Sequence, residues 1–299
     1  MHELGFTFRA MASRCEIRLC AEGEAAGQRW AQAAIAEVRR IEAKFSRYTE
    51  DSVTTHINRA AGGPALEVDD ETAALLDFGA TLWTSSGGRF DLTAGVLRRA
   101  WRFDLGRLPA QAELDRLREL IGWPKVEWDR ATRRLRLTCE GMEIDFGGLG
   151  KEYAADRAAG VLLAQGARHG FVSLGGDVRA LGAAPDGAPW RIGIQHPRAA
   201  SGQTMGAIDI TTEGLATSGD YERYLEIDGQ RYCHILDPRT GWPAQHWRSV
   251  SVAAPVCVAA GACSTVAMLM PRDEALAFLR AQGVAFLAVD ADGEVWRGA

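Results

Sequence analysis

Glycine residues and a lysine near the middle of the chain have a spacing that could hold phosphate. Gly147, Gly148 and Gly150 fill three of four consecutive positions, and Lys151 follows them at the start of an expected helix. Glycine lets a backbone approach a ligand closely, and a helix N-terminus offers unpaired N–H groups with partial positive charge. A tight strand-to-helix turn with a solvent-facing lysine is the alternative interpretation, and these residues alone do not separate the two. The spacing matches neither a Walker P-loop nor the Gly-x-Gly-x-x-Gly pattern of a dinucleotide fold.

A histidine beside a turn is the candidate for proton transfer. His234 precedes Asp237 by three residues, and Asp237-Pro238 with Thr240-Gly241 has the composition of a turn. Lone histidines are more often structural than catalytic, but loops and turns carry function, so both roles stay open. The chain has no Gly-x-Ser-x-Gly elbow and no His-Glu-x-x-His motif, so hydrolase and zinc-protease templates are unsupported.

Hydrophobic periodicity predicts one α+β unit over residues 1–299, with a large, mostly antiparallel sheet packed by helices. Helices are expected over 25–45, in a short segment ending at 58, and over 70–85, 111–121, 259–270 and 273–282. Strands are expected over 6–21 with a break at 11–13, and over 126–128, 135–144, 171–178, 190–195, 206–211, 215–218, 224–227, 232–236, 249–254, 284–289 and 294–297. The 135–144 strand leads into the central glycine turn. The 171–178 strand contains a glycine pair, which often marks the close approach of a ligand.

Composition excludes several classes of protein. The chain has 299 residues, of which 47% are hydrophobic and 24% charged, and its net charge of -5 disfavours nucleic acid as a partner. Its six cysteines are scattered without a Cys-x-x-Cys pair, which fits free thiols rather than a disulfide scaffold or a zinc site. No run is long enough for a membrane span. The first residues lack a signal-peptide layout, so the expected compartment is the cytoplasm, or the periplasm if a leader precedes them.

Taken together, the turns of this chain resemble those of the FAD:protein FMN transferase (ApbE) family, from about Met11 to Leu287. Each motif is weak by itself, but seven of them occur in the family's order. They are Met11-Ala12-Ser13, Phe45-Ser46-Arg47-Tyr48 with Asp51-Ser52 and Ile57-Asn58, Gly88-Arg89-Phe90-Asp91-Leu92-Thr93 with Trp101, Asp145-Phe146-Gly147-Gly148-Leu149-Gly150-Lys151, Ser173-Leu174-Gly175-Gly176-Asp177, Ala216-Thr217-Ser218-Gly219-Asp220-Tyr221-Glu222-Arg223, and His234-Ile235-Leu236-Asp237-Pro238-Arg239-Thr240-Gly241.

The resemblance implies a T-fold-like α+β protein with FAD in a cleft between subdomains. Family members cleave FAD with a divalent metal, usually Mg²⁺, and attach FMN to a Ser or Thr of a target protein, releasing AMP; some hydrolyse FAD to FMN and AMP. By resemblance, His234 is the catalytic base, and the Gly150 carbonyl with Thr265 binds the metal. The residues implied in FAD binding are Met11, Tyr48, Phe90, Asp91, Thr93, Lys151, Ser173, Gly175, Gly176, Ser218, Gly219, Asp220, His234 and Ile235.

One position departs from the family pattern. The family's Ala-Asp-Ala-Leu-Ser-Thr segment, whose aspartate ligates the metal, has Gly261 in the place of that aspartate here. Mg²⁺ prefers anionic oxygen ligands, so this loss predicts a weakened metal site. Glu152, where many relatives have glycine, is either a substitute carboxylate or a helix-start glutamate favoured by the dipole. The alternative function is therefore an FAD-binding protein, or an FAD pyrophosphatase, with a degenerate metal site and little or no transferase activity.

Overall fold

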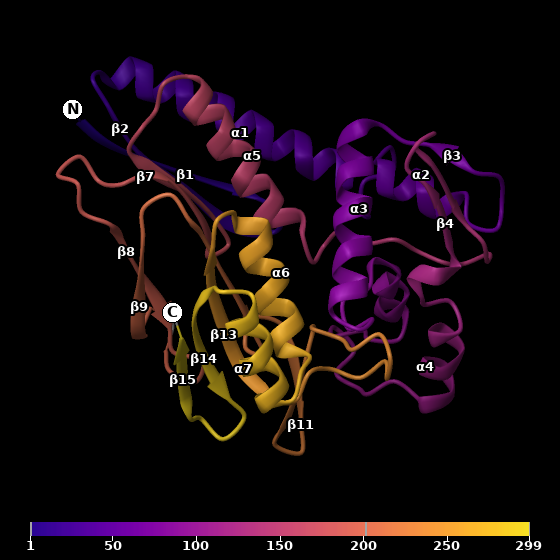
Figure 1. Cartoon of the computed structure of the whole chain (residues 1–299). Helices are drawn as coiled ribbons and strands as arrows, with labels where there is room; N and C mark the ends of the chain where they lie inside the picture. The colour runs from indigo at the N-terminus through magenta and orange to yellow at the C-terminus, as the bar shows by residue number, and fades with distance from the viewer. Residues whose placement is uncertain (1, 201, 299) are drawn as a thin grey trace.

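The central feature of the fold is an eight-stranded antiparallel sheet (Figure 1). The computed structural model describes residues 2–200 and 202–298. The strand order is β1-β2-β6-β7-β10-β13-β14-β15. The bounds are β1 His2–Ala10, β2 Ser13–Ala21, β6 Gly170–Leu174, β7 Asp177–Gly182, β10 Gly214–Gly219, β13 Trp247–Ala254, β14 Ala285–Asp290 and β15 Val295–Gly298. The predicted α+β class with a large antiparallel sheet is confirmed.

Four helices cover one face of this sheet: α1 (Glu24–Phe45), α5 (Gly150–Ala164), α6 (Cys257–Met268) and α7 (Arg272–Ala281) (Figure 1). Helix α1 is amphipathic, and its buried stripe includes Ala34, Val38 and Ile41 at helical spacing. Helices α5 and α6 instead bury mostly small residues, so their backbones can approach each other and the sheet closely. This close approach brings the first turn of α5 near α6.

A two-stranded ribbon packs against apolar residues of the sheet outside the main core. Strands β8 (Trp190–Gln195) and β9 (Thr204–Ile210) pair with each other, and they contribute Ile194 and Ile210 to a second apolar cluster. The sheet contributes Val178, Leu215 and Ala253 to the same cluster. Since the cluster is separate from the main core, the centre of the sheet is buried on both faces.

The elements from α2 to β5 form a lobe beside the sheet (Figure 1). Trp101 ties this lobe to the C-terminal half of the chain, because its Nε1–H donates to the Gly241 carbonyl at 2.7 Å. A small β11–β12 hairpin lies on that half, and its Tyr232 stacks on Trp101. The bounds are α2 Val53–Arg59, α3 Asp70–Ser85, α4 Gln111–Arg118, the 3₁₀ segments η1 Leu92–Arg99 and η2 Trp123–Lys125, β3 Leu66–Glu67, β4 Val126–Asp129, β5 Arg134–Leu137, β11 Tyr224–Ile227 and β12 Gln230–Cys233.

The structure corrects several predicted elements near the glycine turns. The strand expected over 135–144 ends at Leu137, so irregular backbone, not a strand, leads into the central loop. The single strand expected over 171–178 is two strands, β6 and β7, and Gly175 and Gly176 form the turn between them with φ of 63° and 98°. Positive φ at both central residues is what a two-residue hairpin with a type I′ turn requires. The helix expected over 111–121 ends at Arg118, and the strand expected over 232–236 ends at Cys233.

No helix among the described residues combines the length and the apolar character that a membrane crossing requires.

The contact between β10 and α6 predicts a strict need for glycine at position 214. A Cβ on Gly214 would lie 2.2 Å from the backbone nitrogen of Cys257, so Gly214→Ala should lower the free energy of unfolding. The expected loss is about 1–3 kcal/mol, the usual cost of overpacking, measured by urea denaturation. Gly160→Ala is the control, because Gly160 lies within α5 with no atom within 4 Å of its added Cβ, and a gain of about 0.5–1 kcal/mol is expected there. Wild-type stability of Gly214→Ala would contradict the close packing.

Candidate functional site

The central glycine loop is attached to the side lobe through Asp145. The Asp145 side chain accepts a hydrogen bond from the Gly147 N–H at 2.9 Å and forms an ion pair with Arg47. Its own N–H donates to the Leu92 carbonyl at 2.9 Å. The loop ends where α5 begins at Gly150, and no side chain caps that helix. The N-terminal end of α5 is therefore held in place from the lobe side without a capping residue of its own.

Lys151 forms an ion pair with a buried carboxylate. Its Nζ donates to Asp177 Oδ2 at 2.5 Å, and Asp177 Oδ1 accepts from the Thr217 N–H at 3.3 Å. Asp177 is 2% exposed, so its charge requires these partners. Burial opposes the charge of Lys151, but the carboxylates of Asp177 and Glu152 outweigh that cost and raise its pKa. Lys151 is therefore a fixed cation rather than a free solvent-facing lysine.

Two hairpin turns meet beside this ion pair. Met11, in the β1–β2 turn, has a positive φ of 50°, and its N–H donates to Glu42 Oε1 at 2.6 Å. In the β6–β7 turn, a Cβ on Gly175 would lie 2.9 Å from Ser13 Oγ and 3.6 Å from Lys151 Cδ. The close approach explains the glycine at position 175. The structure thus brings together the predicted residues Met11, Gly175 and Lys151.

Hydroxyl groups gather where β10 ends against α6. Ser218 Oγ lies 2.8 Å from Ser264 Oγ and 3.1 Å from Thr265 Oγ1. Ser264 Oγ also donates to the Gly261 carbonyl at 2.9 Å. Ser218 and Thr265, predicted for FAD and for metal respectively, are therefore neighbours.

Glu152, in the first turn of α5, has a buried carboxyl group that lacks hydrogen-bond partners. It is 8% exposed, and its Oε2 has no hydrogen-bond partner among the described residues. Burial, and secondarily the negative charge of Asp177, raises its pKa to about 7. A Cβ on Gly261 would lie 2.6 Å from Glu152 Oε1, so the carboxyl group lies directly against α6. An unpaired carboxyl oxygen near hydroxyls is a donor set that fits a hard divalent cation.

Within residues 2–200 and 202–298, no group of three or more His, Cys, Asp or Glu side chains is placed to hold a metal. Gly150, the other predicted metal ligand, is the first residue of α5. Its carbonyl accepts within the helix, and only its second lone pair is open to another contact.

His234 is held by the backbone of Arg223. Its N–H and its Nδ1 contact the Arg223 carbonyl at 3.0 and 3.2 Å. A carbonyl only accepts, so Nδ1 carries the proton, and Nε2 of the neutral ring has a free lone pair. The ring is open to solvent, but protein atoms around it disfavour the imidazolium, and this desolvation lowers its pKa. Lys151 and Arg223 lower it slightly further. His234 is thus a neutral base near pH 7.

The other predicted residues divide into contacts with the loop and internal pairs. Phe90 lies against the central loop, since a Cβ on Gly148 would be 3.3 Å from its ring, and Tyr48 is 80% exposed. Asp91 Oδ1 accepts from Thr93 Oγ1 at 2.6 Å. Asp220 is held by Arg198 in a two-bond ion pair at 2.7 and 2.6 Å. Ser173 is half-buried, Gly176 is exposed, and Gly219 and Ile235 are buried.

The site contains one buried charged residue, Asp177, that the sequence did not identify as a site residue. Asp177 was visible only as the last residue of the Ser-Leu-Gly-Gly-Asp motif. A charged residue directly after a glycine turn and before an apolar strand is the available signal. Its partner Lys151 lies 26 residues away, so the pair could not be recognised from local spacing.

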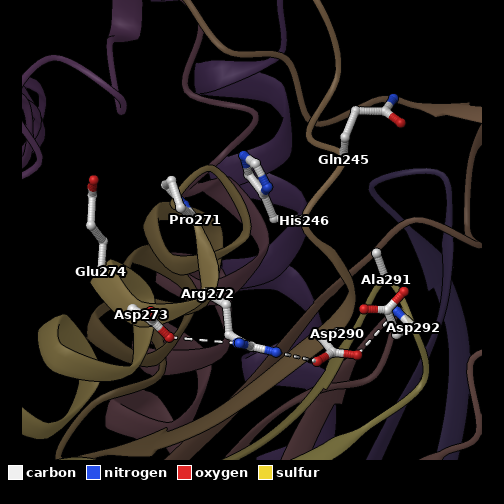
Figure 2. A pocket seen from close by; sticks show the side chains of 9 residues that line it. All are labelled: Gln245, His246, Pro271, Arg272, Asp273, Glu274, Asp290, Ala291 and Asp292. Carbon is white, nitrogen blue, oxygen red and sulfur yellow. Dashed lines mark hydrogen bonds and ion pairs between the residues drawn. The ribbon is translucent and has the colours of Figure 1, made fainter.

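A surface hollow elsewhere on the molecule contains none of the predicted site residues (Figure 2). The hollow is acidic, because four carboxylates (Asp273, Glu274, Asp290 and Asp292) line it with one arginine, Arg272, which lies 3.5 Å from Asp273 and 3.8 Å from Asp290. Asp290 also accepts backbone N–H groups from residues 292–294. We therefore assign this hollow no role in the site.

Comparisons with known proteins agree on one family. A sequence model of the ApbE family matches residues 11–288. The FAD:protein FMN transferase of Salmonella typhimurium is 30% identical over 257 residues, which are 84% of this chain and 73% of that protein. The ApbE protein of Thermotoga maritima has a TM-score of 0.92 at 32% identity and covers 99% of this chain and 97% of its own. The flavin transferase ApbE of Vibrio cholerae has a TM-score of 0.88 at 25% identity, covering 100% and 97%.

The buried ion pair predicts a large effect of Lys151→Ala on stability. Removing the lysine leaves Asp177 with only the Thr217 N–H, and the expected loss is about 2 kcal/mol, below the roughly 3–5 kcal/mol of a fully buried pair. The expected loss is smaller than for a fully buried pair because the lysine side chain is 34% exposed to solvent. The double variant Lys151→Ala/Asp177→Asn should lose less stability than Lys151→Ala alone, because no buried charge is left unpaired. Arg18→Ala, which breaks an exposed pair with Glu16, is the control and should change stability by less than about 1 kcal/mol. Additive effects in this double-mutant cycle would contradict the coupling.

Proposed function

Because this chain belongs to the ApbE family, we propose that it is an FAD:protein FMN transferase. The hydroxyl of a Ser or Thr on an acceptor protein attacks the phosphorus of the FMN half of FAD. The pyrophosphate bond breaks, FMN becomes esterified to the acceptor, and AMP leaves. The hydroxyl proton passes to a base on the enzyme. Such a reaction depends mainly on positioning and on stabilisation of phosphate charge.

The convergence of Lys151 with the two hairpin turns is the observation that supports this activity most strongly. A pyrophosphate needs cations and N–H groups at a place where backbone can approach. Lys151 has three N–H donors, and its contact with Asp177 uses one, so others remain for a phosphate oxygen. The turn at Gly175 brings backbone beside it, and Ser13, whose Oγ donates to the Met11 carbonyl at 3.1 Å, lies against Gly175. We assign FAD to a cleft of this T-fold-like architecture, between the sheet and the side lobe.

A divalent cation, Mg²⁺ in this proposal, belongs beside the same phosphates. Thr265 Oγ1 and the Gly150 carbonyl would hold it, as the resemblance implies. When bound, it supplies positive charge that stabilises the transferring phosphoryl group. The unpartnered oxygen of Glu152 supports a cation in this region.

His234 is the proposed base. Its Nδ1–H is engaged by the Arg223 carbonyl, so its orientation is set and Nε2 can accept the hydroxyl proton. The lowered pKa keeps the ring neutral at pH 7, which is the form that accepts a proton.

Incubation of the purified protein with FAD and Mg²⁺, with and without a purified acceptor domain, tests the proposed function. Chromatography follows AMP and FMN, and intact mass follows FMN on the acceptor. A covalent FMN adduct with equimolar AMP supports the transferase. AMP and free FMN in equal amounts, with no adduct, would identify an FAD pyrophosphatase. FAD binding without cleavage would identify a binding protein.

Lys151→Ala should weaken FAD binding. The expected loss is roughly 1–3 kcal/mol, typical of a charged hydrogen bond, which corresponds to about 5- to 150-fold in Kd. Quenching of flavin fluorescence measures it. Riboflavin is the control, because it lacks phosphate and its affinity should not change. An equal loss for riboflavin and FAD would mean that Lys151 acts only on folding.

His234→Ala should abolish cleavage and leave FAD bound. A general base contributes about 10²–10⁴ in rate, so turnover should fall by that factor while the Kd for FAD stays near wild type. The base works when unprotonated and its pKa is lowered, so the acidic limb of the wild-type pH–rate profile should lie below the ordinary histidine value of 6.5. A limb above that value, or activity in the variant near wild type, would exclude His234 as the base.

A further inference from the structure

The side chain of Glu152 occupies the space beside Gly261. Glu152 is in the first turn of α5, and Gly261 is in α6. A Cβ on Gly261 would lie 2.6 Å from Glu152 Cγ and Oε1 and 2.8 Å from Cδ. Atoms do not approach so closely without a shift, so a side chain at 261 and Glu152 in its present position exclude each other. The absence of a side chain at 261 is what lets a carboxylate from α5 reach α6.

The carboxylate of Glu152 is buried without the partners that such a group requires. The residue is 8% exposed, and its Oε2 makes no hydrogen bond among the described residues. The adjacent cation, Lys151, donates to Asp177 instead. The helix dipole does not explain the burial, because an exposed glutamate in the first turn interacts with it equally well. Burial of an unpaired carboxylate is unfavourable, and a bound cation would supply the missing partner and remove this cost.

Neutral oxygens lie on the same side of α6. Thr265 follows Gly261 by four residues, so both lie on one helix face. Ser218 Oγ is 3.1 Å from Thr265 Oγ1, which brings the end of β10 to this face. Carboxylate and hydroxyl oxygens are the donors that Mg²⁺ and Mn²⁺ prefer.

We propose that Glu152 supplies the anionic oxygen of a divalent-cation site on the face of α6 that carries Thr265. The inference rests on the proposed function, in which the cation acts on the pyrophosphate of FAD. Mg²⁺ is commonly held by one or two carboxylates together with substrate phosphates. Because Glu152 is a single carboxylate, FAD is expected to complete the site and to raise the metal affinity.

Mn²⁺ titrations followed by the EPR signal of the free ion test this assignment without relying on turnover. They use the wild type and Glu152→Gln, and repeat both with FAD in the His234→Ala background so that FAD is not cleaved. Glu152→Gln should lose at least about tenfold in Mn²⁺ affinity. The control is Glu143→Gln, which removes another buried glutamate, one that is paired with Arg98 and Arg99. Its Mn²⁺ affinity should stay within about twofold of wild type.

Two results overturn the assignment: unchanged Mn²⁺ affinity in Glu152→Gln, or no Mn²⁺ binding by the FAD-loaded protein. Flavin fluorescence in the same samples reports FAD binding, and it therefore distinguishes failure of the metal role of Glu152 from failure of the proposed function. If FAD binds and Mn²⁺ affinity is independent of Glu152, the role of Glu152 is wrong and the proposed function stands. If FAD does not bind, the proposed function fails, and this inference fails with it.

A reciprocal swap keeps the test decisive if Glu152→Gln folds poorly. Gly261→Asp alone places a second carboxylate in occupied space and should lower the Tm. Glu152→Gly/Gly261→Asp removes the clash and moves the carboxylate to α6, so it should recover both the Tm and the Mn²⁺ affinity. A double variant that folds like wild type but has lost its Mn²⁺ affinity would show that this carboxylate does not bind metal.

Discussion

The buried carboxylate of Asp177 is the group on which the geometry of the site depends. A charge that is 2% exposed must be paired, and the available partners come from two other elements. Lys151 reaches it from the start of α5, and the Thr217 N–H reaches it from β10. The penalty for leaving Asp177 unpaired therefore fixes α5, the β6–β7 turn and β10 relative to one another.

The partial overlap of β7 with β10 makes this arrangement possible. Strand β10 pairs with β13 from Gly214 to Gly219, but its pairing with β7 covers only Gly214 and Leu215. Beyond that point β7 has turned back through its glycine hairpin, and a side-chain carboxylate takes the place of a backbone partner. The end of β10 is thus free to present Ser218 to α6. The site therefore uses polar groups of β10, the Thr217 N–H and the Ser218 hydroxyl, that lie where the strand is no longer paired with β7.

Two buried carboxylates share a single lysine at the start of α5. Asp177 takes the hydrogen bond of Lys151, whereas Glu152 lies against Gly261 with one oxygen unpartnered. The two carboxyl groups lie where α5 meets α6 and β10, and a cation would be stabilised there. In the sequence, Gly261 indicates the loss of a metal ligand. In the structure, the space left by its missing side chain is occupied by the carboxyl group of Glu152.

The sequence by itself determined the class of the fold, the family and the location of most turns. These are local properties: helical periodicity placed α1 and α3, and glycines marked the central loop. The pair Gly175-Gly176, expected inside one strand, instead forms the hairpin turn between β6 and β7. Strand ends near the site were less predictable, because apolar residues in 138–144 pack into the core without a ladder partner. Only the tertiary structure decided which charges meet. Ion pairing and steric exclusion act over a few ångströms between residues far apart in the chain, so neither the bond of Lys151 to Asp177 nor the fit of Glu152 beside Gly261 is encoded in local spacing.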